Sequence, residues 1–179
     1  MRTLSHKILI LFLSFLILFS FFFFFNDELT PFFRYERELI LQGEVWRLLT
    51  CHFVHVNTTH AIMNFSALVL IMLALGYKLS CKEWLSSAVF LSVFISLGLL
   101  IFSPDIAWYV GFSGVSHGLL VFMLIKNSLT GDKLYLIALL LVIVKIGREQ
   151  LPEFDIFLLI FLPLSLSMHI CTVRLAVHY

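Results

Sequence analysis

Ser113 stands in a short polar segment that could support acyl-transfer chemistry inside an otherwise apolar chain. It lies between Gly111 and Gly114, in the order Gly-Phe-Ser-Gly, where a loop would enter a helix. Glycines allow another chain to approach the backbone closely, and the positive end of a helix stabilises a developing oxyanion. A hydroxyl nucleophile needs a base, and His169 in the last apolar segment is the candidate.

His60 and Asn64 form a second polar pair. They are four residues apart, so on a helix they share one face and can donate hydrogen bonds toward a common point. Each feature has a plainer explanation, because small residues, an interhelical hydrogen bond and a packed histidine are common in membrane helices. Together, a serine, a histidine and a donor pair on different spans are the minimum for hydroxyl-based acyl transfer. His117 follows Ser113 by four residues, and this spacing makes it a competing base.

The composition places the elements that carry these residues in a lipid bilayer. Of the 179 residues, 61% are hydrophobic and 13% are charged, whereas soluble domains have about 45–50% apolar and about 25% charged residues. A net charge of +1 removes the electrostatic basis for nucleic-acid binding. Cys51, Cys81 and Cys171 form no CxxC pair, so we expect neither a disulfide framework nor a metal site, and no cofactor.

The hydropathy predicts one all-α membrane domain over residues 1–179, because a helix crosses the hydrocarbon core in about 20 residues. The expected six transmembrane helices lie at residues 8–25, 60–77, 84–103, 113–127, 133–146 and 164–177, with a long external loop at 26–59. The first segment is interpreted as a retained span, since no small-residue cleavage pattern follows it.

The distribution of basic residues predicts that both termini lie in the cytoplasm. Basic residues collect at the N-terminus, the second and fourth connections and the tail: Arg2, Lys7, Lys78, Lys82, Lys126, Lys133 and Arg174. Connections rich in Lys and Arg stay on the cytoplasmic side of a membrane. The loop at 26–59 and the end of the fourth span that carries Ser113 are therefore expected on the external side.

The order of these motifs resembles that of the rhomboid intramembrane serine proteases. The matching motifs are Trp46-Arg47 in the external loop, His60-x-x-x-Asn64 on the second span, Gly111-x-Ser113-Gly114 on the fourth and His169 on the sixth. The resemblance implies a six-helix fold in which Ser113 attacks a peptide carbonyl and His169 acts as general base and acid. It implies that His60, Asn64 and the Ser113 backbone N–H bind the oxyanion. It gives His117 an orienting or packing role.

Within that family the sequence is most similar to the rhombosortase subgroup. The motifs are Trp46-Arg47-x-x-Thr50-x-x-Phe53-x-His55, the block from Gly111 to Gly118, and Lys145-x-x-x-Glu149-Gln150. This resemblance implies membrane-anchored substrates, namely exported proteins with a C-terminal Gly-Gly-type sorting signal, a hydrophobic helix and a basic tail. It also implies a bacterial inner membrane, with the active site facing the periplasm.

The last span departs from the family pattern in sequence and in depth. Ile170, Cys171 and Thr172 follow His169, where rhomboids usually have small residues and often a Gly three positions on. A span that began at Phe154 would place His169 about 22 Å along the helix, too deep to reach Ser113. Pro163 resolves this depth if it separates an interfacial cap over residues 155–162 from a helix that starts near Leu164.

Two other functions remain open from the sequence. One is a rhomboid-like pseudoprotease that binds transmembrane segments without cutting them. The other is a redox or transport protein that uses His52, His55, His60, His117 and His169 as metal or haem ligands. The simpler interpretation makes His52 and His55 hydrogen-bonding groups of the external loop. The chain has no HExxH motif, and Leu129-Thr130-Gly131-Asp132 lacks the first Gly of an aspartyl GxGD motif.

Overall fold

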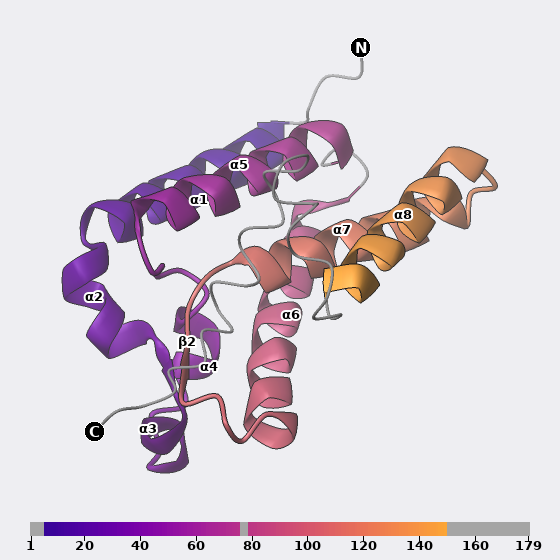
Figure 1. Ribbon diagram of the computed structural model, residues 1–179. Coiled ribbons are helices and arrows are strands. Elements are labelled where there is room, and N and C mark those ends of the chain that lie inside the picture. Colours follow the sequence, from indigo (N-terminus) through magenta and orange to yellow (C-terminus); the bar gives the residue numbers. More distant parts are fainter. Residues whose placement is uncertain (1–5, 76–78, 150–179) are drawn as a thin grey trace.

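The computed structural model describes residues 6–75 and 79–149, which are mostly helical (Figure 1). The predicted sixth span at 164–177, with Pro163 and His169, lies outside the described residues. In chain order the elements are α1 His6–Phe24, α2 Asn26–Phe33, β1 Tyr35–Glu36, α3 Arg37–Leu41, α4 Arg47–Thr50, α5 Thr58–Leu75, α6 Cys81–Phe102, β2 Trp108–Tyr109, α7 Ser113–Ser128 and α8 Lys133–Glu149.

Five of the predicted spans coincide with α1, α5, α6, α7 and α8, each within a few residues at its ends. Within the described ranges, α5 and α6 are long and apolar enough to cross a membrane. A third span is possible if α1 and α2, which meet at a bend of 97°, are counted as one. Helices α7 and α8 have 16 and 17 residues. The six-span count and its orientation stay predictions.

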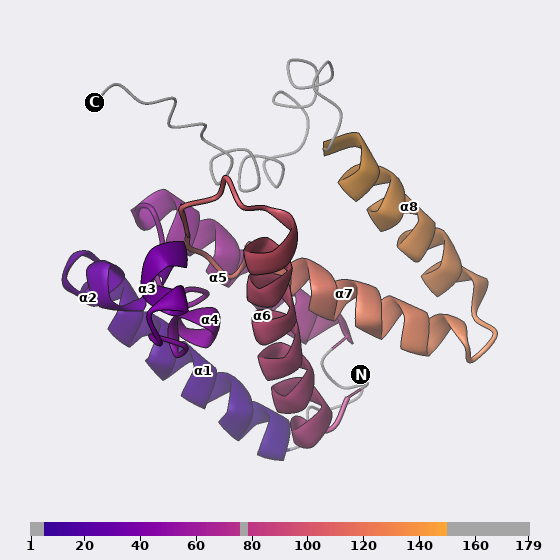
Figure 2. The same ribbon diagram turned by 90° about the horizontal axis from the view of Figure 1, so that it is seen from below.

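Helix α7 lies at the centre of the core, against α5 and α6, and α8 returns beside it (Figures 1 and 2). The buried side of α5 runs through His60, Asn64 and Leu68 at intervals of four residues, which is the spacing of one helix face. The core residues from these elements are Leu68, Ile71, Met72, Leu75, Leu79, Trp84, Phe112, Val115, Leu119, Met123 and Leu124. The polar pair at the start of α5 therefore faces the same interior as this apolar core.

Two glycines allow α7 to approach α6 closely. A Cβ atom at Gly118 would lie 2.8 Å from Leu91 Cδ2, and one at Gly114 would lie 3.3 Å from Ile95 Cδ1. Small residues one turn apart are a common device for close helix packing in membranes. The Gly-x-Ser-Gly segment is therefore held against α6 with the help of the glycine that directly follows the serine.

The Trp-Arg-x-x-Thr motif of the external loop binds the C-terminal end of α2. The last carbonyls of a helix have no intrahelical donor, and here side chains from α4 and the residue before it supply donors. Arg47 Nη1 donates to the carbonyls of Pro31 and Arg34 at 3.1 and 2.9 Å. Trp46 Nε1 donates to the Phe32 carbonyl at 3.3 Å, and Thr50 Oγ1 to the Phe33 carbonyl at 3.0 Å. These bonds fold the loop onto α2.

A short antiparallel pair of strands joins the external loop to the connection before α7. Tyr35 in β1 pairs with Tyr109 in β2, and Glu36 pairs with Trp108. A small buried cluster of Tyr35, Ile40 and Cys51 packs against the end of α6 through Leu99 and Leu100. The external loop is thus fixed to the segment that leads into Ser113.

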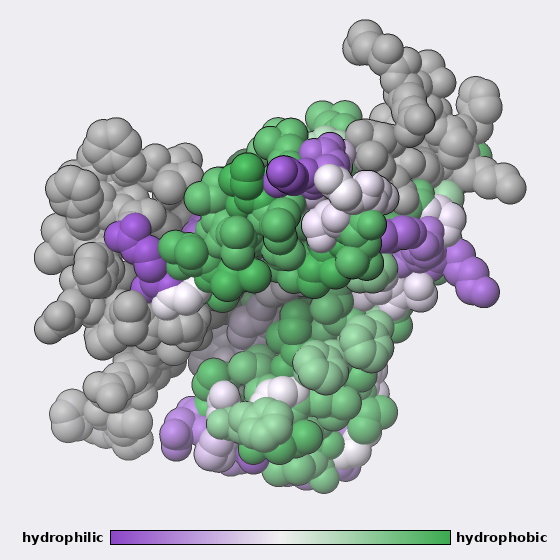
Figure 3. All heavy atoms as spheres, turned by 90° about the vertical axis from the view of Figure 1, so that its right-hand side faces the viewer, coloured by the Kyte–Doolittle hydropathy of each residue, from purple (hydrophilic) through white to green (hydrophobic). Residues whose placement is uncertain are grey.

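Most of the outer surface of the described helices is apolar. Helices α6 and α8 expose large hydrophobic side chains along their length, among them Phe90, Phe94, Ile137, Leu141 and Val144. Figure 3 shows such side chains covering much of one face, with hydrophilic residues confined to small groups. An ion pair between Lys126 and Glu83 joins the ends of α7 and α6 that lie away from Ser113. Such a surface is suited to contact with lipid.

Candidate active site

Ser113 begins α7 and is almost fully buried, with 5% of its surface exposed. Residues at a helix start have backbone N–H groups without intrahelical acceptors, so the α7 N-terminus can supply donors to an anion. The chain reaches Ser113 through Gly111, whose φ is +114°. That left-handed conformation is one that L-residues with side chains seldom adopt, and it turns the chain from β2 into the helix.

The ring of His60 packs directly on Gly111. A Cβ atom at Gly111 would lie 2.7 Å from His60 Cε1 and 3.2 Å from His60 Nε2, so a larger residue would displace the imidazole. His60 is 2% exposed. Its two ring nitrogens have no hydrogen-bond partner among the residues that the structure describes. A buried imidazole with available nitrogens therefore packs against the glycine two residues before the serine, where a reacting carbonyl group would need donors.

Asn64 lies one turn after His60 on the buried face of α5. Its side-chain amide donates to the His60 carbonyl at 2.9 Å, and the residue is 3% exposed. A primary amide nitrogen carries two hydrogens, so one bond to the backbone leaves a second donor. The structure thus brings His60 and Asn64 together, with the Asn64 amide anchored to the helix backbone.

His117 is engaged by the carbonyl group of Ser113 and by Lys145. Its Nδ1 lies 2.8 Å from the Ser113 carbonyl oxygen, and its Nε2 lies 3.3 Å from Lys145 Nζ. Since a carbonyl only accepts, Nδ1 carries the hydrogen and Nε2 accepts from the ammonium group. Both ring nitrogens of His117 are therefore engaged by groups other than the Ser113 hydroxyl. The predicted motif residue Lys145 brings α8 to the site.

The predicted base His169 lies outside the described residues. Trp46 and Arg47 lie in the external loop, where Trp46 is half exposed and Arg47 is 4% exposed. Their bonds to α2 carbonyls give them a structural role. The site residues Gly111 and Gly114 have packing roles against His60 and Ile95.

His55 lies beside His60 and is held by its backbone. The Asn26 amide accepts from the His55 N–H and donates to the His55 carbonyl, both at 2.8 Å. The centroids of the two imidazole rings are 5.3 Å apart in an edge-to-face arrangement. Burial, together with the nearby charge of His60, lowers the pKa of His55 to about 3, against a smaller opposing effect of a backbone hydrogen bond to Phe53. His55 is neutral at physiological pH.

Four polar residues near the site were missed by the sequence reasoning: Asn26, Ser92, Ser96 and Tyr109. Ser92 and Ser96 lie four residues apart in a nearly charge-free span, and that spacing was a usable signal for a buried polar contact. Both serines are buried and contact His52. Asn26 bonds to the backbone of His55, 29 residues away, and the Tyr109 hydroxyl donates to the carbonyl of Gly111, two residues further along. No helix or strand spacing in the sequence marks either contact.

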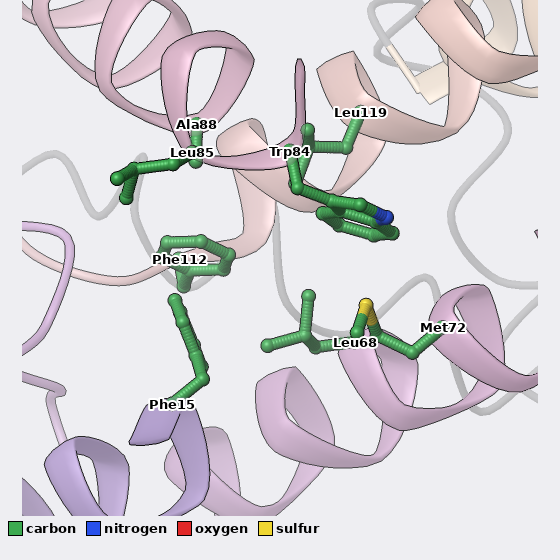
Figure 4. Close-up of a pocket in the computed structure, with 8 residues that line it drawn as sticks. All are labelled: Phe15, Leu68, Met72, Trp84, Leu85, Ala88, Phe112 and Leu119. Carbon is green, nitrogen blue, oxygen red and sulfur yellow. The ribbon is translucent and has the colours of Figure 1, made fainter. Parts of the chain in front are cut away.

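Two cavities border the elements that carry these residues. An apolar one of about 40 Å³ lies beneath Phe112, between α1, α5, α6 and α7 (Figure 4); its lining residues are Phe15, Leu68, Met72, Trp84, Leu85, Ala88, Phe112 and Leu119. The other, of about 350 Å³, lies at the bend between α1 and α2 and reaches Thr58 and Ala61 at the start of α5. It is lined by polar groups of Asn26, Asp27 and Glu28, so it is suited to hold water near His60.

No group of three His, Cys, Asp or Glu side chains that could hold a metal ion occurs within residues 6–75 and 79–149. The polar groups described above are a serine, imidazoles, an amide and helix N–H groups. These are the groups of acyl-transfer chemistry.

A comparison with protein families gives the class of this chain. The Rhomboid domain family matches residues 42–172, which is most of the sequence. No curated protein and no solved structure matches the chain. The chain therefore belongs to the rhomboid family, whose members are intramembrane serine proteases. The family and the apolar helices together indicate an integral membrane protein.

Proposed function

We propose that this protein is an intramembrane serine endopeptidase that uses Ser113 and His169 as a catalytic dyad. The observation that carries the proposal is the placement of Ser113 at the buried N-terminus of α7, with the His60 ring packed on Gly111 two residues earlier. A nucleophile, helix N–H donors and an imidazole donor meet in one water-poor place, as stabilisation of an oxyanion requires.

In this mechanism Ser113 Oγ attacks the scissile peptide carbonyl while its proton passes to His169. The oxyanion accepts hydrogen bonds from the Ser113 backbone N–H, His60 and Asn64. The C–N bond breaks as the imidazolium of His169 protonates the leaving amine. Water then attacks the acyl-enzyme, with His169 as base, and releases the new carboxylate. The polar cavity at the bend between α1 and α2 is suited to supply that water.

We further propose a rhombosortase-like specificity, for exported proteins that carry a C-terminal transmembrane sorting segment of the Gly-Gly type. Lys145, of the motif that suggests this subgroup, reaches the carbonyl of Ser113 through His117, which supports a link between the motif and the site. The protein would then lie in a bacterial inner membrane, with N- and C-termini in the cytoplasm and the site facing the periplasm.

A serine-directed fluorophosphonate probe tests the dyad in detergent-solubilised protein. We expect the wild type to be labelled and Ser113→Ala and His169→Ala to be unlabelled. Ser116→Ala is the matched control, because Ser116 is equally buried on the same helix and has no role in the mechanism. A folded wild type that resists the probe would support a pseudoprotease that binds transmembrane segments without cutting them.

Co-expression with a candidate substrate tests the specificity. We expect the wild type to cleave a reporter whose C-terminal transmembrane segment follows a Gly-Gly pair, and Ser113→Ala to leave it intact. The control reporter has Leu-Leu in place of Gly-Gly. Equal cleavage of both reporters would contradict the rhombosortase-like specificity while leaving the protease function in place.

A further inference from the structure

One buried imidazole joins three segments around the serine. His52, between Thr50 and Phe53 of the external loop motif, has no exposed surface. Its Nδ1 lies 3.2 Å from the Gly111 carbonyl oxygen. Its Nε2 lies 2.9 Å from the Ser92 carbonyl oxygen and 3.1 Å from Ser96 Oγ, both on α6. His52 therefore connects the external loop to α6 and to the glycine that precedes Ser113.

The partners of His52 fit two tautomers of the ring, and only one of them lets the ring donate to Gly111. Burial lowers the pKa of His52, against the smaller opposing effects of its contacts with the Ser92 and Gly111 backbones, so the ring is neutral and has one N–H. With the hydrogen on Nδ1, the ring donates to Gly111 while Nε2 accepts from the Ser96 hydroxyl. With the hydrogen on Nε2, the ring would instead donate to the Ser92 carbonyl, and a lone pair would face the Gly111 oxygen. In the Nδ1–H form the Nε2 lone pair lies 2.9 Å from the Ser92 oxygen, and the Ser96 hydroxyl at 3.1 Å supplies the hydrogen that this nitrogen accepts. The Ser92 carbonyl lies inside α6 and has a backbone donor.

The two partners of His52, Ser96 and Gly111, make further hydrogen bonds of their own. Cys51 Sγ lies 3.5 Å from Ser96 Oγ, so the thiol can donate to the hydroxyl that donates to His52. Gly111 is held through both of its backbone polar groups, because its N–H also donates to the Cys51 carbonyl at 3.0 Å. The Tyr109 hydroxyl is a second donor to the Gly111 carbonyl, at 3.2 Å.

We propose that His52 is a positioning residue, whose Nδ1–H tautomer, fixed by the Ser96 hydroxyl, holds Gly111 and so sets Ser113 against His60. The proposal rests on the proteolytic function proposed above. Gly111 is two residues from Ser113 and in contact with the His60 ring. A shift of its peptide plane would therefore move the nucleophile relative to the oxyanion donor, and displacements of about 1 Å can cost 10²-fold in rate.

The tautomer itself can be measured without any catalysis. In protein labelled with ¹⁵N-histidine, the His52 signals are assigned by their loss in His52→Gln. We expect Nδ1–H in the wild type and a change to Nε2–H in Ser96→Ala. Ser92→Ala is the matched control, because the Ser92 hydroxyl donates to Ala88 at 2.8 Å and only its carbonyl faces the ring. An Nε2–H ring in the wild type, or no change in Ser96→Ala, would overturn the proposal.

Kinetics on a cleaved reporter separate positioning from general stability. The amide nitrogen of Asn can occupy the place of Nδ1, and that of Gln the place of Nε2. We therefore expect His52→Asn to retain about tenfold more kcat than His52→Gln, with KM unchanged in both. Ser96→Ala should lose about tenfold in kcat and Ser92→Ala less than about twofold.

Two outcomes separate this proposal from the proposed function. Equal kcat for the Asn and Gln variants, at equal folded fractions, would overturn the positioning role of His52 and leave the protease function intact. A folded wild type that neither cleaves nor reacts with the probe would contradict the protease function. In that case the tautomer measurement would still decide whether Ser96 fixes the ring.

Discussion

At the residue scale, Gly111 combines a left-handed backbone conformation with close contact to the His60 ring. Substitution by alanine, which adds one methyl group, tests both features. We expect Gly111→Ala to lose labelling of Ser113 by more than about tenfold, because the new Cβ would displace the His60 ring as well as strain the backbone. Probe labelling per folded molecule is the measurement.

Gly43 supplies the control for that substitution. Its φ is +110°, close to that of Gly111, but a Cβ there would have nothing within 4 Å. Gly43→Ala should therefore cost about 1 kcal/mol of stability from backbone strain and keep normal labelling. Equal loss of labelling in both variants would mean that strain alone, and not the contact with His60, governs the site.

The buried histidines of the external loop predict acid sensitivity. His55 has a pKa of about 3 in the folded protein, compared with 6.5 for the free group. At pH values between these two, the His55 side chain is protonated in the unfolded chain and neutral in the folded chain. Stability should be full above about pH 6.5 and fall as the pH drops toward 3, by up to about 1.4 kcal/mol per pH unit from this group. Thermal unfolding in detergent between pH 7 and pH 4 measures the slope.

His55→Leu tests whether His55 contributes to that slope. This variant removes the titrating ring but keeps an apolar side chain beside Phe19, and it leaves the bonds between Asn26 and the backbone of residue 55 in place. Its stability should depend less steeply on pH than that of the wild type. A slope identical to the wild type would assign the acid sensitivity to other groups.

The sequence was most informative about residues whose role follows from local spacing. His60 and Asn64, four residues apart, do lie on one buried face of α5, and Ser113 does begin a helix. Contacts between distant segments were not predictable in the same way. The bonds from His52 to Gly111 and Ser96 span 59 and 44 residues, and a pattern of residue types along one chain does not encode such pairs.

At the element scale, the contact of α7 with α6 depends on Gly118. A Cβ there would lie 2.8 and 3.0 Å from the two methyl carbons of Leu91, so Gly118→Ala should push the helices apart and cost about 1–3 kcal/mol. Denaturation in mixed micelles measures the loss. Adding Leu91→Ala should recover part of it, because the small side chain removes the clash.

Gly98 is the matched control on α6. A Cβ at this position would meet nothing within 4 Å, so Gly98→Ala should leave stability unchanged or raise it by up to about 1 kcal/mol through helix propensity. A Gly118→Ala variant as stable as Gly98→Ala would contradict the close packing of α6 and α7.

Helix positions were predictable because long apolar segments must form helices in a bilayer. The segment at 26–59 was predicted only as a long external loop, and the structure shows that it contains α2, α3, α4 and β1. Its order comes from side-chain bonds to backbone carbonyls, such as those of Arg47 and Thr50. Such bonds form only when the partner segment has folded, so they cannot be predicted from the hydropathy of the sequence.

At the scale of the whole molecule, the predicted orientation can be read from two exposed positions. Val45, in the external loop, is 61% exposed, and Leu129, after α7, is 83% exposed. In a background with Cys81→Ser and Cys171→Ser, we expect an impermeant maleimide to label Val45→Cys in intact spheroplasts. Leu129→Cys should react only after lysis, because the positive-inside rule places the Lys-rich connection inside.

Cys51 can stay in that background because it has no exposed surface. Labelling of both engineered cysteines from the outside would contradict an odd number of crossings between them. It would require a different path for α5, α6 or α7 through the membrane.

The capping of α2 by the external loop has a consequence for which parts of the sequence are free to change. Arg47, Trp46 and Thr50 all donate to main-chain oxygens of residues 31–34. Every amino acid has the same backbone carbonyl group, so these hydrogen bonds depend on the shape of the C-terminal end of α2 and not on which amino acids form it. The identities of Arg47, Trp46 and Thr50 are therefore constrained, because each supplies a particular donor. The side chains at positions 31–34 can be exchanged for others, provided that the backbone keeps the same turn.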